Sequence, residues 1–162
     1  RPGIALYGGR AVNGRKNPMA PVVTLHVPIL QVVEARTGES VGYGAAYSLS
    51  RNSRLAIIGH GYADGFMRSL SSTNMRPGGK VAIRGQVCPV IGRISMDLSI
   101  VDITELGQDI PNPGEGAEVL GSTIGVDDQA DAGGTIGYEI LTSLRLARVN
   151  RNYIGDGNLP PE

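Results

Sequence analysis

The sequence predicts a mainly β domain with one or two short helices, preceded by a strand that belongs to a different domain. Glycine (24) and proline (10) together make up 34 of the 162 residues, and so many turn residues favour short strands over long helices. Short apolar or alternating runs recur between these turns. A length of 162 residues fits one domain with a core of its own.

The first residues read differently from the rest. Residues 4–7 form a continuous apolar run between glycines, which suits a strand buried on both faces. Residues 9–21 are polar, basic and rich in Gly, Asn and Pro, as in a linker. The sequence starts at Arg1 without an initiator methionine. We therefore expect a piece of a longer protein, with a strand remnant and linker over 1–20 and a β-rich domain over 21–162.

Half-buried strands are predicted next. Val23, Leu25 and Val27 alternate with polar residues. Pro28 interrupts this run, which indicates an edge strand or a bulge. Gly85 is the expected turn of a hairpin. The further strands are expected over 55–58, 81–84, 87–91, 98–103 and 117–120.

One helix is predicted late in the chain. Ile136, Ile140 and Leu144 recur every four residues and define one helix face, and Thr135 suits the N-cap. A last strand is expected over 146–154.

The charge balance excludes several classes of function. Fifteen basic and fifteen acidic side chains leave no net charge, so the chain has no bulk attraction to nucleic acid or to an anionic membrane. No apolar run approaches the ~20 residues of a membrane helix, and no signal peptide opens the sequence. The single Cys88 and two histidines cannot form a disulfide framework or a Cys/His zinc site. We expect no metal and a reducing, cytoplasmic setting.

Tyrosines set beside glycines are the most distinctive local pattern. They occur in VGYG at Tyr43, in HGYADG at Tyr62 and in IGYE at Tyr138. Glycine lets the backbone approach a ligand closely, and a phenol in such a loop can present its hydroxyl to a bound molecule. On spacing alone, a turn with its aromatic ring packed on the core is the more frequent explanation.

Other candidates favour structural explanations. Asp64 and Asp97 could act as the carboxylate pair of a glycosidase, but Asp before Gly is more often a turn former. Cys88 has no basic neighbour in sequence and suits a buried structural thiol. Three arginines spaced three apart could bind phosphate, but a solvated face is favoured in a neutral chain; they are Arg145, Arg148 and Arg151.

Four segments in order resemble one family: RPGIALYG, VGYGAAY, IGHGYADGF with CPVIGRISMD, and GTIGYEILTSL. They are similar to the C-terminal part of alanine racemases, enzymes of fold-type III that depend on pyridoxal 5'-phosphate. The resemblance covers nearly the whole chain. It implies a missing N-terminal (β/α)8 barrel whose last strand is similar to residues 1–8, a C-terminal β-barrel-like domain, and a head-to-tail homodimer.

The resemblance implies roles where residues match the family's motifs. Tyr43 is similar to the catalytic tyrosine, and Met96 to the residue whose backbone N–H meets the substrate carboxylate. Tyr62 is similar to a tyrosine near the entrance. The family's cofactor ligands are an arginine on the pyridine nitrogen, two backbone donors to the phosphate and a tyrosine hydroxyl on the phosphate; they match Arg1, Gly3, Ile4 and Tyr138 in that order. In the family the first three residues reach the partner's site, whereas the cofactor ligands serve their own.

The chemistry implied by the resemblance needs two opposed acid/base groups, because racemisation removes the α-proton from one face of the carbon and returns a proton to the other. The cofactor aldimine acidifies that carbon. A lysine serves one face and Tyr43 the other. An unperturbed phenol has a pKa of about 10, so cationic or donor groups must lower it in such a site.

The lysine that holds the cofactor is expected outside this chain. Only Lys16 and Lys80 occur, and neither sits where the family's lysine belongs, so the chain alone is expected to be inactive. Gly42, where serine is common, and His60 depart from the family pattern. The implied activity supplies D-alanine for peptidoglycan. A racemase of serine or another amino acid, and a non-catalytic dimerisation module, stay open.

Overall fold

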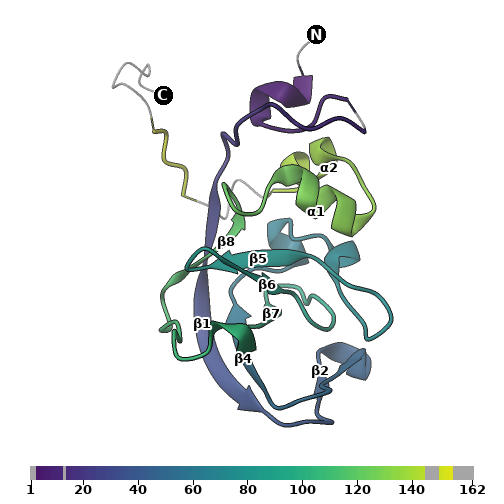
Figure 1. The fold of residues 1–162 in the computed structure, drawn as a ribbon, viewed down its shortest axis with the longest axis vertical. Coiled ribbons are helices and arrows are strands. Elements are labelled where there is room, and N and C mark those ends of the chain that lie inside the picture. Colours follow the sequence, from purple (N-terminus) through teal and green to yellow (C-terminus); the bar gives the residue numbers. More distant parts are fainter. Residues whose placement is uncertain (1–2, 13, 145–149, 155–162) are drawn as a thin grey trace.

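The computed structural model describes residues 3–12, 14–144 and 150–154 (Figure 1). Within these residues a six-stranded antiparallel sheet has the order β6-β5-β8-β1-β4-β7, and β2 and β3 form a separate pair. The strands are β1 (Leu25–Ala35), β2 (Ser40–Val41), β3 (Tyr47–Ser48), β4 (Ser53–Ile58), β5 (Lys80–Ile83), β6 (Gln86–Pro89), β7 (Ser99–Asp102) and β8 (Gly116–Leu120). The two α-helices are α1 (Val126–Gly133) and α2 (Gly137–Ser143), and the short 3-10 helices are η1 (Gly3–Tyr7), η2 (Tyr43–Ala45), η3 (Tyr62–Asp64), η4 (Arg68–Leu70) and η5 (Thr104–Leu106).

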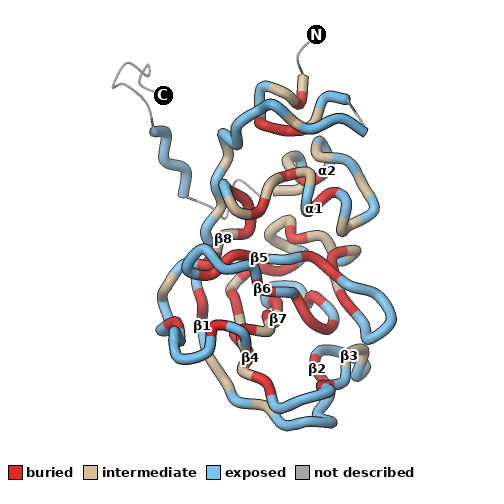
Figure 2. The backbone as a smooth tube through the Cα atoms, viewed as in Figure 1, coloured by how far each residue is buried: buried red, intermediate tan, exposed pale blue. Residues whose placement is uncertain are grey.

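The large sheet curls into a nearly closed barrel. Its two edge strands meet where the Ile91 N–H donates to the Ile100 carbonyl over 2.9 Å, next to a bridge between Val90 and Val101. The largest cluster of buried residues comes from the strands of this sheet and the segments packed on them (Figure 2), and Ile58 is among its members with no exposed surface. The mainly β, barrel-like fold expected from the sequence is confirmed.

Turn and bulge signals in the sequence have the predicted effects. β1 pairs with β8 on one side and β4 on the other, and its register shifts between Ile29 and Gln31, directly after Pro28. The proline therefore marks a bulge in an interior strand, not an edge strand. Arg84 and Gly85 both have positive φ values, 52° and 78°, as a two-residue hairpin turn requires.

The strand expected over residues 4–7 is wrong, because this run forms the 3-10 helix η1. The backbone bonds to itself: the Gly8 N–H donates to the Ala5 carbonyl and the Gly9 N–H to the Ile4 carbonyl, each over 3.1 Å. No described strand pairs with this segment. A short apolar run is ambiguous between helix and strand, and here only Ile4 is buried, whereas Leu6 is exposed.

The helices follow β8 and pack on each other. Ile136, not Thr135, is the N-cap residue of α2, and the Thr135 hydroxyl bonds to the Glu139 carboxylate instead. The strand expected over 146–154 falls partly outside the described residues, and the described part, 150–154, is not a strand. None of the helices in the described ranges is long and apolar enough to cross a membrane.

Candidate functional site

Three of the predicted cofactor ligands come together at the N-terminal end of the domain. The Ile4 N–H donates to the Tyr138 hydroxyl over 2.6 Å, although the two residues lie 134 positions apart. Gly3 has a φ of +48°, and a Cβ there would overlap the same hydroxyl. We call Gly3, Ile4 and Tyr138 the Tyr138 cradle. It brings two hydrogen-bond donors, an amide and a phenol, to one point beside a residue without a side chain.

The cradle opens on a cavity of about 520 Å³, lined by Ile4, Tyr138, Thr135 and Arg10 among others. The Ile4 N–H donates to the phenol oxygen in this structure, so the Tyr138 O–H is the group that can donate to a phosphate oxygen directly. A phosphate oxygen that took the place of the phenol oxygen at the amide could accept from both groups. Arg1, predicted to bind the cofactor ring, lies outside the described residues. The described residues that line this cavity include no lysine.

Tyr43 lies on a tight turn that only glycines allow. Gly42 and Gly44 have φ values of +76° and +67° on either side of it. A Cβ on Gly42 would lie 2.8 Å from the backbone nitrogen of Arg93, and one on Gly44 would lie 2.6 Å from the Arg93 guanidinium. The tyrosine is 71% exposed and lines a shallow groove of about 360 Å³ with Arg93 and Ser95. The turn therefore holds the phenol out from the domain.

The segments that carry Tyr62 and Met96 are joined by backbone hydrogen bonds. The Tyr62 N–H donates to the Ser95 carbonyl over 3.0 Å, and the Ala63 N–H donates to the Met96 carbonyl over 2.9 Å. Gly61 permits this approach, since a Cβ there would overlap the Met96 carbonyl. Both Tyr62 and Met96 are exposed. The structure thus places Tyr43, Tyr62 and Met96 around one segment, residues 92–98.

Two serine hydroxyls, that of the buried Ser72 and that of the partly buried Ser71, bind the backbone of this segment. The Ser72 hydroxyl accepts a hydrogen bond from the Gly92 N–H over 3.1 Å, and the Ser71 hydroxyl accepts one from the Ile94 N–H over 3.0 Å. His60 is buried with its ring 5.2 Å from that of Phe66. Burial lowers the pKa of His60, and Asp64 opposes this effect. His60, which departs from the family pattern, is therefore an interior residue beneath the loop that carries Tyr62.

The Tyr138 cradle and the Tyr43 turn lie far apart in one chain. β2, which leads directly into Tyr43, lies at one end of the long axis of the molecule, whereas α2, which carries Tyr138, lies towards the other (Figure 1). A single copy of the chain therefore does not bring both tyrosines to one small molecule.

The surroundings of the remaining candidate residues favour structural over catalytic roles. Asp64 accepts a hydrogen bond from the Gly61 N–H over 3.1 Å, which is the turn-forming role, and Asp97 is exposed. Cys88 is buried, and burial raises the pKa of its thiol to about 11, so the structural interpretation is confirmed. Arg151 is exposed, whereas Arg145 and Arg148 lie outside the described residues.

Two residues near the site have no role in the sequence-based interpretation. Arg93 packs against the Tyr43 turn. In the sequence, the feature that could have pointed to it is that it is the one cation in the segment CPVIGRISMD. Asp127 on α1 bonds to the segment that follows η1. In the sequence Asp127 belongs to a group of acidic residues. That pattern does not distinguish it from an ordinary solvent-exposed residue at the start of a helix.

Comparison with known proteins assigns this architecture to a class. The family model for the C-terminal domain of alanine racemase matches residues 22–153. The biosynthetic alanine racemase of Agrobacterium fabrum is 47% identical over 160 residues, which cover 95% of this chain and 41% of that protein. The chain belongs to the alanine racemase family and corresponds to its C-terminal domain.

Solved structures agree. Biosynthetic alanine racemase from Pseudomonas aeruginosa superposes with a TM-score of 0.84 at 34% identity, over 94% of this chain and 41% of that one. Alanine racemase from Bartonella henselae, solved with covalently bound pyridoxal phosphate, gives a TM-score of 0.77 at 38% identity, over 88% of this chain and 38% of that one. The chain spans about two-fifths of the length of such relatives.

Proposed function

We propose that this chain completes the active site of an alanine racemase, which interconverts L- and D-alanine with pyridoxal phosphate and supplies D-alanine for peptidoglycan. The contact between the Ile4 amide and the Tyr138 hydroxyl is the observation that carries the proposal. The amide and the phenol come from distant parts of the sequence and meet beside a glycine. An anionic group of a cofactor could accept there from the hydroxyl and, in place of the phenol oxygen, from the amide. Membership of the family supports the reaction.

In this proposal the Tyr138 cradle holds the cofactor phosphate. The Gly3 and Ile4 amides and the Tyr138 hydroxyl donate to its oxygens, and Arg1 binds the ring nitrogen. When bound, pyridoxal phosphate makes the α-hydrogen of the attached amino acid acidic. A lysine of the N-terminal domain, which lies outside this chain, holds the cofactor covalently. The chain alone is therefore inactive.

Tyr43 removes or returns the proton on one face of the α-carbon. Its exposure and its place on a turn between two glycines with positive φ suit a group that acts outside its own domain. The Met96 N–H binds the substrate carboxylate, and Tyr62 lines the entrance. These three residues serve the site of a second subunit in a head-to-tail homodimer, because the cradle of the same chain lies too far away (Figure 1).

The division of the chain follows from the same proposal. Residues 1–20 belong with the N-terminal domain, and residues 21–162 form the C-terminal domain. The matched share of the relatives, about 41% of the Agrobacterium protein, leaves the N-terminal domain to supply the rest of the site.

A chimeric enzyme tests the proposal. The matching C-terminal part of the Agrobacterium racemase is replaced by this chain, and D-alanine formation from L-alanine is measured with an enzyme that oxidises only the D-isomer. We expect racemisation by the chimera and its loss in Tyr43→Phe. The same assay with L-serine distinguishes an alanine racemase from a racemase of broader or different specificity, which would also form D-serine.

Two results would reject the proposal. A folded chimera that binds pyridoxal phosphate but racemises no amino acid would indicate a non-catalytic module. Full activity in Tyr43→Phe would remove the assigned role of the phenol.

A further inference from the structure

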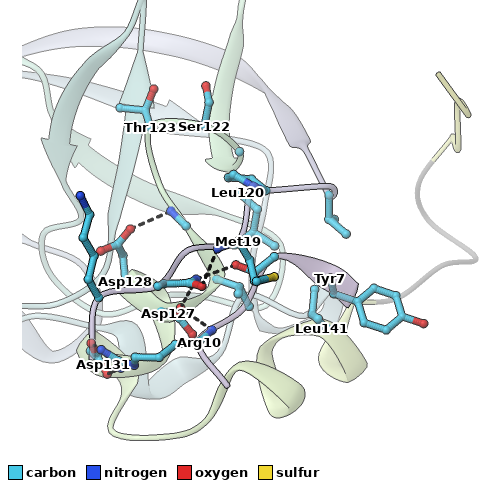
Figure 3. A pocket seen from close by; sticks show the side chains of 18 of the residues that line it. Tyr7, Arg10, Met19, Leu120, Ser122, Thr123, Asp127, Asp128, Asp131 and Leu141 are labelled. Atoms are coloured by element: carbon cyan, nitrogen blue, oxygen red, sulfur yellow. Dashed lines mark hydrogen bonds and ion pairs between the residues drawn. The ribbon is translucent and has the colours of Figure 1, made fainter. Parts of the chain in front are cut away.

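A network of hydrogen bonds fastens the segment after η1 to helix α1. The Asp127 carboxylate accepts a hydrogen bond from the Arg10 N–H over 2.8 Å and another from the Asn17 side-chain amide over 3.2 Å. The same amide donates to the Gly8 carbonyl over 2.8 Å. Arg10 also forms an ion pair with Asp131 over 2.8 Å. We call Arg10, Asn17, Asp127 and Asp131 the Asp127 clasp (Figure 3).

The clasp joins the two parts of the chain that carry the Tyr138 cradle. Gly8 follows directly on η1, which carries Gly3 and Ile4. Asp127 is the second residue of α1, and only residues 134–136 separate α1 from α2, which carries Tyr138. The Asp127 carboxylate thus joins the segment that follows Gly3 and Ile4 to the helix that precedes Tyr138.

Packing beneath the clasp connects it to the cradle. The Ile4 side chain reaches the α1–α2 corner, where a Cβ on Gly137 would lie 3.4 Å from Ile4 and 3.5 Å from Val126. Val126 precedes Asp127 on α1, and a Cβ on Gly9 would lie 3.3 Å from Val126. A shift of the segment relative to α1 would therefore move the Ile4 amide relative to the Tyr138 hydroxyl.

Ile4 is buried at the α1–α2 corner, but beyond η1 the segment is held by hydrogen bonds and not by apolar burial. Tyr7, Val12 and Met19 on the same segment are exposed. The Arg10–Asp131 ion pair is exposed too, with 30% and 62% of the two side chains accessible, and such pairs contribute little. Asp127 is partly buried and accepts from two donors, one of them backbone. Hydrogen bonds to a charged group are the stronger kind, so Asp127 is the main fastening.

We propose that Asp127 is a positioning residue that sets the distance between the two sides of the cradle and thereby the affinity for the phosphate of pyridoxal phosphate. The inference rests on the proposed function of the cradle. It predicts a specific defect: loss of the Asp127 carboxylate weakens binding of the phosphorylated cofactor and leaves binding of pyridoxal, the same aldehyde without the phosphate, unchanged.

The test uses the chain joined to an N-terminal racemase domain as above. The dissociation constants of pyridoxal phosphate and pyridoxal are measured by absorbance titration of the apoprotein. We expect Asp127→Ala to weaken binding of pyridoxal phosphate by roughly ten-fold or more, as loss of hydrogen bonds to a charged group implies, with no change for pyridoxal. Asp127→Asn keeps an acceptor for the Arg10 N–H but loses the charge, so its affinity should lie between that of Asp127→Ala and that of the unsubstituted protein.

Asp128→Ala is the matched control. Asp128 lies on the same turn of α1 and carries the same charge, but its carboxylate accepts from the Gly125 N–H over 2.7 Å and so caps the helix. The substitution removes an equal charge and destabilises the same helix. It should leave the ratio of the two dissociation constants as in the unsubstituted protein.

The outcomes separate the inference from the function it rests on. Equal weakening for both aldehydes in Asp127→Ala, or the same ratio change in Asp128→Ala, would mean a merely structural role and overturn the inference. Unchanged binding in Asp127→Ala, in a protein that racemises alanine, would overturn the inference alone. An unsubstituted protein that binds neither aldehyde would reject the proposed function, and the inference would fall with it.

Discussion

Gly3 is a position where the absence of a side chain has a specific consequence. Its φ of +48° is unfavourable for other residues, and a Cβ would overlap the Tyr138 hydroxyl. We predict that Gly3→Ala weakens binding of pyridoxal phosphate about ten-fold in the chimera, as loss of a hydrogen bond to a charged group implies.

Gly14→Ala is the control for Gly3→Ala. Gly14 also has a positive φ, +75°, but a Cβ there meets nothing within 4 Å. Both substitutions impose backbone strain on the same segment, and only the first intrudes on the cradle. Equal cofactor affinities in the two variants, by absorbance titration, would contradict the assigned cradle.

His60 is predicted to make stability depend on pH. Burial lowers its pKa below the ordinary 6.5, and Asp64 only partly offsets this. The unfolded chain therefore takes up a proton at a higher pH than the folded one. Stability is complete above about pH 6.5 and falls as the pH decreases below it, with a limiting slope of about 1.4 kcal/mol per pH unit for one proton.

Unfolding midpoints between pH 5 and pH 8 test this titration. His60→Leu should flatten the decrease below pH 6.5, whereas His26→Gln, at an exposed position of β1, should retain it. An unchanged pH profile in His60→Leu would assign the effect to another group.

The loop that contains η3 depends on the close approach of two backbones. A Cβ on Gly61 would overlap the Met96 carbonyl, which accepts the hydrogen bond from Ala63. We predict that Gly61→Ala destabilises the domain by about 1–3 kcal/mol, the usual cost of overpacking, and raises the KM for alanine, because Tyr62 and Met96 move apart.

Gly116→Ala on β8 is the comparison for that substitution. Its Cβ would meet His26 at 3.5 Å, an ordinary contact, so stability in denaturant should change by less than about 0.5 kcal/mol. A Gly61→Ala variant as stable as Gly116→Ala would show that the two loops do not depend on this approach.

The elements that the sequence predicts well are those whose pattern reflects burial on one face. The alternation before Pro28 corresponds to the burial pattern of β1, and the turn at Gly85 to the observed hairpin. The spacing of Ile136, Ile140 and Leu144 predicts helix α2, but Ile140 alone of the three is buried, and Ile136 is an exposed N-cap. The prediction fails at residues 4–7, because a short apolar run does not distinguish strand from helix and the backbone there bonds to itself. The sequence does not predict helix α1 either, because its buried face consists of only two small apolar residues, Val126 and Ala130, with Gln129.

The candidate site is only partly readable from sequence for a similar reason. Tyr43, Tyr62 and Tyr138 stand out because glycines flank them. Arg93 and Asp127 do not, because their significance depends on what lies across from them: the Gly44 backbone in one case and the Arg10 amide in the other. Contacts between positions more than 40 residues apart leave no local pattern.

The separation of the cradle from the Tyr43 turn (Figure 1) leads to a prediction about assembly. If Tyr43 serves the site of the partner subunit, a Tyr43→Phe chimera and a chimera without the cofactor lysine should restore activity when unfolded and refolded together. Random pairing would regain roughly a quarter of the unsubstituted activity, since half of the dimers are mixed and each mixed dimer has one intact site.

Activity of the refolded mixture, compared with each variant refolded alone, tests this assembly. No recovery, with mixed dimers demonstrated by differently tagged subunits, would place Tyr43 in the site of its own subunit and contradict the proposed arrangement.

Exchange of the α-hydrogen with solvent reports on each face of the substrate separately. In deuterium oxide, the chimera with Tyr43→Phe should no longer exchange the α-hydrogen of L-alanine, whereas exchange from D-alanine, served by the lysine, should continue. Tyr153→Phe, which alters an exposed tyrosine outside both groups of site residues, should exchange both isomers. Undiminished deuterium incorporation into L-alanine by the Tyr43→Phe protein would show that another group removes that hydrogen.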